Sequence, residues 1–180
     1  MASAFQDSAR VAIICGGQVP AALAVPTGVE LFKILPVSMS VEGTMSADDT
    51  ASSVESVMAR RKAQLVDYAQ AFEPDVLVVE MFPFRHRKFS VEIIALINAV
   101  RQRSPTKVLA SVRDVLVSRP KNQAQYDQRA VGWLNQYFDA VLVHSDPHIV
   151  FLAETFSAYN EIKVPLHYTG YVTAAKLYSC

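Results

Sequence analysis

The chain has 180 residues, of which 51% are hydrophobic and 19% charged, enough apolar material for the core of one ordinary domain. This composition excludes a disordered chain, and the apolar runs are far shorter than the roughly 20 residues that a membrane-spanning helix needs. The formal net charge is zero. We expect neither a nucleic-acid partner nor a membrane span.

The first ten residues and the two cysteines bear on the compartment. Residues 1–10 lack a cationic start followed by an apolar run, so they are not typical of a secretory signal, and we expect a cytoplasmic protein. Cys15 and Cys180 lie at opposite ends of the sequence with no paired spacing. They are therefore expected to be free thiols rather than a disulfide or a metal site.

Short β-branched runs alternate with segments that have helical spacing of apolar residues. The runs predict strands at Val11–Cys15, Val29–Leu35, Val76–Val79, Val108–Val112, Ala140–Val143 and, more weakly, His167–Val172. The helical segments are Val54–Phe72, Val91–Val100, Tyr126–Phe138 and Ile149–Phe156. The alternation predicts a single α/β domain over residues 1–180, a Rossmann-like three-layer sandwich with a mainly parallel sheet of about six strands and right-handed crossovers.

Two connecting segments have a recognisable composition. Pro36–Thr50 is rich in Ser, Thr, Gly and Asp without sustained periodicity, which predicts one long loop that is a candidate lid. Asp146 followed by Pro147 is typical of a helix start, with the Asp as the cap and the Pro at the first helical position. We favour this cap over a catalytic role for Asp146.

Basic residues are concentrated in the middle of the chain. Residues 81–130 hold 10 Lys and Arg against 3 Asp and Glu. The segment Arg85-His-Arg-Lys88 directly precedes a predicted helix, so Arg85, Arg87 and Lys88 together with the helix amino end are candidates for holding a phosphate. A solvated basic loop remains the alternative.

Ligands of open parallel sheets bind beyond the carboxyl ends of the strands, so residues at those ends are the next candidates. Glu80 ends one apolar run and Arg113 ends the next, which predicts an ion pair that either orders two loops or binds a sugar hydroxyl. His144 ends a third run and is a candidate ligand-binding residue. Ser111 lacks the surroundings of a hydrolase nucleophile. We expect no metal and no cofactor, and the sequence assigns no catalytic residue.

Four stretches, taken in order, resemble a known family. They are FPFRHRKF at 82–89, SVRDVLV at 111–117, FDAVLVHSDP at 138–147 and HYTGYV at 167–172. In this order they resemble predicted bacterial glycosyltransferases, distant relatives of the enzyme that adds N-acetylglucosamine to the peptidoglycan lipid intermediate. The resemblance runs from about Val11 to Val172.

The resemblance implies one half of a GT-B enzyme, in which two facing Rossmann-like domains enclose a cleft. The chain is similar to the acceptor-side domain alone, without the donor-side domain and without the first strand and its catalytic-base loop. The implied function is that of a truncated acceptor-side domain, inactive alone, whose ligand is a nucleotide-sugar or another phosphate-containing molecule. The alternative is a stand-alone binding module on the same scaffold.

The implied loss of a first strand leads to two further expectations. We expect Val11–Cys15 to pair directly and in parallel with Val76–Val79, because the strand that would separate them is missing. We also expect self-association to a homodimer, or association with a separate donor-domain chain.

Overall fold

The computed structural model describes residues 2–17, 25–40, 43–47, 52–113, 116 and 122–172. The chain forms two compact units. Unit 1 comprises residues 1–73 and 91–103, and unit 2 comprises residues 74–90 and 104–180. The α/β class predicted from the sequence is confirmed.

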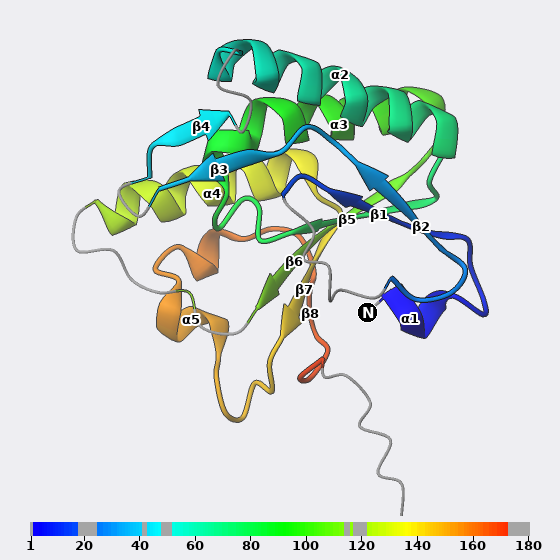
Figure 1. The fold of residues 1–180 in the computed structure, drawn as a ribbon. Helices are drawn as coiled ribbons and strands as arrows, with labels where there is room; N and C mark the ends of the chain where they lie inside the picture. The colour runs from blue at the N-terminus through cyan, green and yellow to red at the C-terminus, as the bar shows by residue number, and fades with distance from the viewer. Residues whose placement is uncertain are drawn as a thin grey trace, which may run out of the picture. The chain divides into compact units, whose positions relative to one another are not determined.

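Unit 1 combines two small sheets with helices (Figure 1). Its elements are α1 (Ala2–Phe5), β1 (Val11–Cys15), β2 (Val29–Lys33), β3 (Val37–Met39), β4 (Met45–Ala47), α2 (Val54–Phe72) and all but the first residue of α3 (Ser90–Arg103). Strands β1 and β2 pair in parallel with Val11 opposite Val29, whereas β3 and β4 form an antiparallel hairpin.

Helix α2 begins and ends where its sequence provides caps. The Ser53 side chain accepts a hydrogen bond of 3.2 Å from the Ser56 backbone N–H at the amino end. At the carboxyl end Glu73 adopts a left-handed conformation (φ 51°) before Pro74, which cannot continue the helix. The buried residues recur every fourth position, which places them on one stripe of the helix: Val57, Arg61, Leu65 and Ala69.

Unit 2 is built on one four-stranded parallel sheet, in the order β5-β6-β7-β8 (Figure 1). Its elements are β5 (Val76–Glu80), η1 (Arg87–Phe89), β6 (Lys107–Arg113), α4 (Gln123–Tyr137), β7 (Ala140–His144), α5 (Leu152–Thr155), η2 (Tyr159–Glu161) and β8 (Leu166–Tyr168). All three ladders are parallel, so the carboxyl ends of β5, β6 and β7 share one edge, as predicted.

The core of unit 2 consists of buried side chains of the sheet and of aromatic rings. The central strands bury Val108, Val112 and Val141 completely. Phe82, also fully buried, contacts the rings of Trp133 and Phe138 with centroids 5.2 and 6.2 Å away. Burial of these apolar side chains stabilises the fold of unit 2 and so holds the strand ends in place.

The single sheet of about six strands is not found. Strands occur in each of the six predicted segments, but β1 and β2 form their own sheet, and the hairpin β3–β4 adds two strands. Within each unit β1 pairs with β2 and β5 pairs with β6, so the pairing expected between Val11–Cys15 and Val76–Val79 stays a prediction. An apolar run predicts that a strand forms but not which strand it pairs with.

Two local predictions are corrected as well. Part of Pro36–Thr50, expected to be one loop, forms the hairpin β3–β4, closed by backbone hydrogen bonds between Ser40 and Thr44 (2.9 Å) and between Gly43 and Ser40 (2.9 Å). The helix expected over Ile149–Phe156 is only the single turn α5. In Pro36–Thr50 the polar side chains do not distinguish a loop from a short hairpin. In Ile149–Phe156 the apolar stretch is too short to distinguish a helix from turns.

Candidate functional site at the carboxyl edge of the β5–β8 sheet

The strand register places a row of polar side chains on one face of the sheet at its carboxyl edge. Glu80 lies opposite Ser111, and Arg113 lies opposite His144. Ser111 and Arg113 are two positions apart on β6, so their side chains point to the same face. We call Glu80, Ser111, Arg113, His144 and the adjoining Thr169 the edge row.

The predicted pair between Glu80 and Arg113 is present. The Arg113 guanidinium donates from Nε (3.0 Å) and from Nη2 (2.5 Å) to Glu80 Oε1. Both side chains are largely exposed, so solvent screens the pair and it adds little to stability. Because the pair is weak and accessible, its charges are available to a ligand.

His144 connects two hydroxyl groups across β6, β7 and the end of β8. Its Nε2 lies 2.9 Å from Ser111 Oγ, and its Nδ1 lies 2.7 Å from Thr169 Oγ1. Sequence reasoning set Ser111 aside and did not consider Thr169. The period-two spacing of Ser111 and Arg113 was the signal that could have placed Ser111 beside the predicted site.

The surroundings of His144 favour its neutral form. Burial lowers the pKa of His144 below its ordinary value, while the Glu80 carboxylate acts against this shift and the Arg113 guanidinium adds to it. A neutral imidazole is able to accept a proton near neutral pH.

The basic segment after β5 is only partly brought to this edge. Met81 and His86 both adopt positive φ (62° and 57°), and the Arg85 backbone N–H donates to the Met81 carbonyl at 2.6 Å. Desolvation lowers the pKa of His86, with Glu80 opposing the shift and Arg85 adding to it, so this turn lies within electrostatic range of Glu80.

Arg87 and Lys88 follow this turn in η1. The Arg87 guanidinium stacks over the ring of Tyr126 on α4, 3.6 Å from its centroid, and Lys88 is exposed. The expectation that Arg85, Arg87 and Lys88 hold one phosphate stays a prediction. Arg113 is bonded to Glu80, and Arg85 and Glu80 both act on the pKa of His86.

Asp146 caps a turn rather than a helix. Its Oδ1 accepts a hydrogen bond of 2.9 Å from the His148 N–H, and its carbonyl accepts bonds from Ile149 and Val150. The helix start predicted at Asp146 and Pro147 is therefore wrong: Asp146 caps a turn, and α5 begins only at Leu152.

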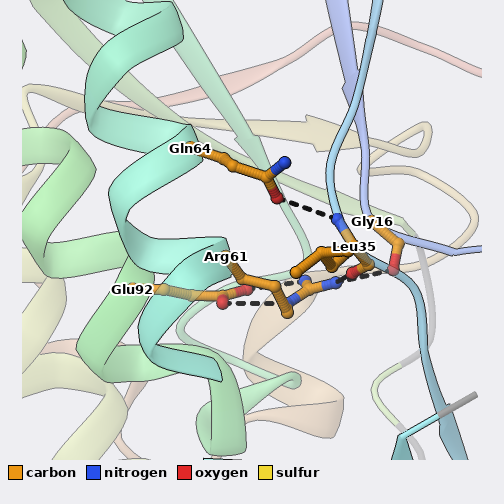
Figure 2. Close-up of polar contacts among 5 residues, drawn as sticks. All are labelled: Gly16, Leu35, Arg61, Gln64 and Glu92. Atoms are coloured by element: carbon orange, nitrogen blue, oxygen red, sulfur yellow. Dashed lines mark hydrogen bonds and ion pairs between the residues drawn. The ribbon is translucent and has the colours of Figure 1, made fainter. Parts of the chain in front are cut away.

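Unit 1 contains a second polar cluster that the sequence did not reveal (Figure 2). Arg61 on α2 and Glu92 on α3 form a bidentate pair with distances of 3.0 and 2.8 Å, and both side chains are buried. The remaining terminal nitrogen, Nη1, donates to the carbonyls of Gly16 (2.9 Å) and Leu35. These partners satisfy both charges, so the cluster is a structural clamp rather than a ligand site.

The described residues contain no group of three or more His, Cys, Asp and Glu side chains that could hold a metal ion. Within the same residues, no helix has the length and apolar character required to cross a bilayer.

A scan against protein-family models and searches of curated proteins and of solved structures found no match to this chain. The α/β class and the edge row are therefore the basis for a functional proposal.

Proposed function

We propose that the carboxyl edge of β5–β8 binds a phosphate-containing ligand, such as a nucleotide-sugar, and that the chain acts as the acceptor-side domain of a glycosyltransferase. The observation that carries the proposal is the edge row itself. It presents an exposed guanidinium, an exposed carboxylate and a neutral imidazole on one face of a parallel sheet. Parallel sheets bind ligands at this edge.

The chemistry of the row suits a sugar phosphate. The planar Arg113 guanidinium matches phosphate oxygens in a bidentate manner, and Arg85 adds a second cation from the neighbouring turn. Glu80 accepts hydrogen bonds from sugar hydroxyl groups once a phosphate has taken its place beside Arg113. A weak, exposed ion pair is the kind of contact that a ligand displaces at low cost.

The binding proposal is tested by calorimetry with inorganic phosphate, uridine diphosphate and uridine diphosphate N-acetylglucosamine as probes. Arg113→Ala and Arg85→Ala should each weaken binding about tenfold or more, equivalent to roughly 1.4 kcal/mol. Arg129→Ala, an exposed cation on α4, is the matched control and should bind as the unchanged chain does. Arg87→Ala should have a smaller effect, because Tyr126 already holds that guanidinium. Equal affinities of all four variants for every probe would show that the anion site lies elsewhere or does not exist.

A transfer assay distinguishes the two functions that share this site. In the GT-B arrangement a second, facing domain holds most of the nucleotide-sugar, so the 180-residue chain should bind phosphate-containing probes without transferring sugar. Turnover above a boiled control would contradict this expectation. Restored transfer on adding a donor-side partner chain would favour the glycosyltransferase domain over a stand-alone binding module.

A further inference from the structure

The hydrogen bonds of Thr169 determine which nitrogen of His144 carries a proton. Thr169 Oγ1 lies 3.0 Å from the Gly170 carbonyl oxygen and 3.4 Å from the Val143 carbonyl oxygen. Carbonyl oxygens only accept hydrogen bonds, so each of them is an acceptor for the single hydroxyl proton of Thr169. When that proton goes to a carbonyl, Thr169 Oγ1 accepts the bond from His144 Nδ1–H, which is 2.7 Å away.

This tautomer fixes the direction of the next hydrogen bond. A neutral imidazole with a proton on Nδ1 has a lone pair on Nε2. Ser111 Oγ, 2.9 Å from Nε2, therefore donates its proton to His144. The three side chains have the proton arrangement of an activated nucleophile, in which a hydroxyl donates to a base and a third group orients that base.

We propose that Ser111 is a nucleophile toward acyl esters, with His144 as its base and Thr169 as a positioning residue. This activity is independent of the phosphate ligand proposed above, because it rests on the hydroxyl–imidazole–hydroxyl contacts and needs no anion. Sequence patterns of hydrolases do not predict it, since the arrangement is formed by geometry across three strands rather than by a local motif.

The reaction balances with groups in the edge row. Ser111 Oγ attacks the ester carbonyl carbon while its proton moves to His144 Nε2, and Nδ1–H stays bonded to Thr169. The tetrahedral intermediate then collapses with loss of the alkoxide, which takes the proton from Nε2 and leaves as an alcohol. Water, deprotonated by the same nitrogen, releases the carboxylic acid and restores Ser111.

Two neighbours of Ser111 assist this chemistry. Arg113 lies two residues further along the same face of β6, where its charge favours a developing oxyanion. Glu80, in register with Ser111, favours the imidazolium that forms on His144. Thr169 carries no charge and stabilises that imidazolium less than a carboxylate would, so we expect slow turnover.

Access to Ser111 depends on the exposed pair beside it. Ser111 and His144 are 4% and 9% exposed, respectively, whereas the Arg113 and Glu80 side chains are 73% and 58% exposed. Glu80 is in register with Ser111 and accepts a hydrogen bond of 2.5 Å from Arg113, so we take the opening of this pair as the route by which an ester reaches Ser111. An exposed ion pair opens at a cost of about 1 kcal/mol or less.

The test uses a small, neutral fluorophosphonate on the intact chain, with the labelled residue identified by mass spectrometry. We expect an adduct on Ser111, absent from Ser111→Ala and absent from heat-denatured protein. His144→Gln should slow labelling at least tenfold, with folding checked by circular dichroism. Hydrolysis of p-nitrophenyl acetate should follow the same order across these variants.

The role of Thr169 is tested separately. Thr169→Val removes the acceptor for Nδ1–H and should slow labelling, whereas Thr169→Ser should restore it. Nitrogen-15 spectra of His144 should show Nδ1 protonated in the unchanged chain and a mixture of tautomers in Thr169→Val. The proposal is overturned if Ser111 remains unlabelled both in the unchanged chain and in Arg113→Ala, in which the neighbouring side chain is removed. Equal labelling rates with and without His144 would also overturn it.

Discussion

At the scale of single residues, Gly16 is set directly against the guanidinium of Arg61. A Cβ at Gly16 would lie 2.6 Å from Arg61 Nη2, and this guanidinium is fixed by its bonds to Glu92 and cannot move away freely. Gly16→Ala should therefore lower the free energy of unfolding by about 1–3 kcal/mol.

The adjacent glycine supplies the control for that substitution. A Cβ at Gly17 meets nothing within 4 Å, so Gly17→Ala should change the stability by no more than about 0.5 kcal/mol. Denaturant unfolding of both variants measures the difference. Equal effects of the two substitutions would mean that the close approach at Gly16 is absent.

The lowered pKa of His144 predicts how stability depends on pH. In the unfolded chain this imidazole takes up a proton near its ordinary pKa of 6.5, whereas in the folded chain burial and Arg113 delay protonation despite Glu80. Its stabilising contribution is therefore complete above the unfolded pKa and is lost as the pH falls through the folded one.

The measurement is urea unfolding at a series of pH values below 7. His144→Gln should flatten the pH dependence in the range just below 6.5. The remaining dependence should include His86, whose pKa is also lowered, mainly by desolvation. The control is His148→Gln, which removes an exposed imidazole in the turn after β7. A profile unaffected by His144→Gln would contradict the prediction.

The polar residues differ in how far sequence reasoning could place them. Glu80 and Arg113 were predictable as a pair because each ends an apolar run, and neighbouring parallel strands end at the same edge. The contact of Thr169 with His144 was not predictable, because only the register of β7 and β8 brings the residue after β8 close to the end of β7. Arg61 was not predictable either, because a lone arginine on a helix is normally solvated.

At the scale of elements, the Arg61 clamp joins helices α2 and α3 to the chain beyond β1 and β2. Removing Arg61 leaves Glu92 as a buried carboxylate without its partner and deprives the Gly16 and Leu35 carbonyls of a donor. Arg61→Ala should therefore cost about 3–5 kcal/mol of stability, well above the effect of an exposed substitution.

Arg60→Ala is the matched control, because Arg60 is the preceding residue of α2 and its side chain is exposed. It should change stability by no more than about 0.5 kcal/mol. Chemical denaturation monitored by circular dichroism compares the two variants. A loss of less than about 1 kcal/mol for Arg61→Ala would show that the clamp is dispensable.

Element prediction succeeded where a long pattern coincided with capping residues. The predicted bounds of Val54–Phe72 agree with α2, whose start and end are marked by Ser53 and by Glu73 with Pro74. It failed over Ile149–Phe156, where the backbone forms turns before and after α5. Eight residues are too few for helical periodicity to decide between a helix and successive turns.

At the scale of the whole chain, pairing between distant strands was the least predictable feature. The apolar runs indicated strands in the right segments, and the parallel order β5-β6-β7-β8 follows from helix-length crossovers. The separate β1–β2 sheet does not follow from local patterns. Its strand β1 is half-buried at every position, as expected for a small sheet.

The edge strand β5 leads to a prediction about assembly. Within its sheet β5 pairs only with β6 among the described strands, and the side chains of Val76 and Val78, on one face of β5, are 51% and 41% exposed. An exposed apolar edge strand with unpaired backbone groups tends to pair with another chain. We therefore expect a homodimer in which β5 of one protomer pairs with β5 of its partner, since a two-fold axis brings identical edges together.

Light scattering over a range of protein concentrations tests this expectation. Val78→Lys places a charge on the pairing edge and should shift the chain toward the monomer, because charged side chains on edge strands oppose pairing. Ile149→Lys is the control: Ile149 is 66% exposed but lies in the turn after β7, away from the β5 edge, and its substitution should leave the dimer intact. A monomer at the highest concentration would rule out the dimer. A dimer equally weakened by both substitutions would place the interface away from β5.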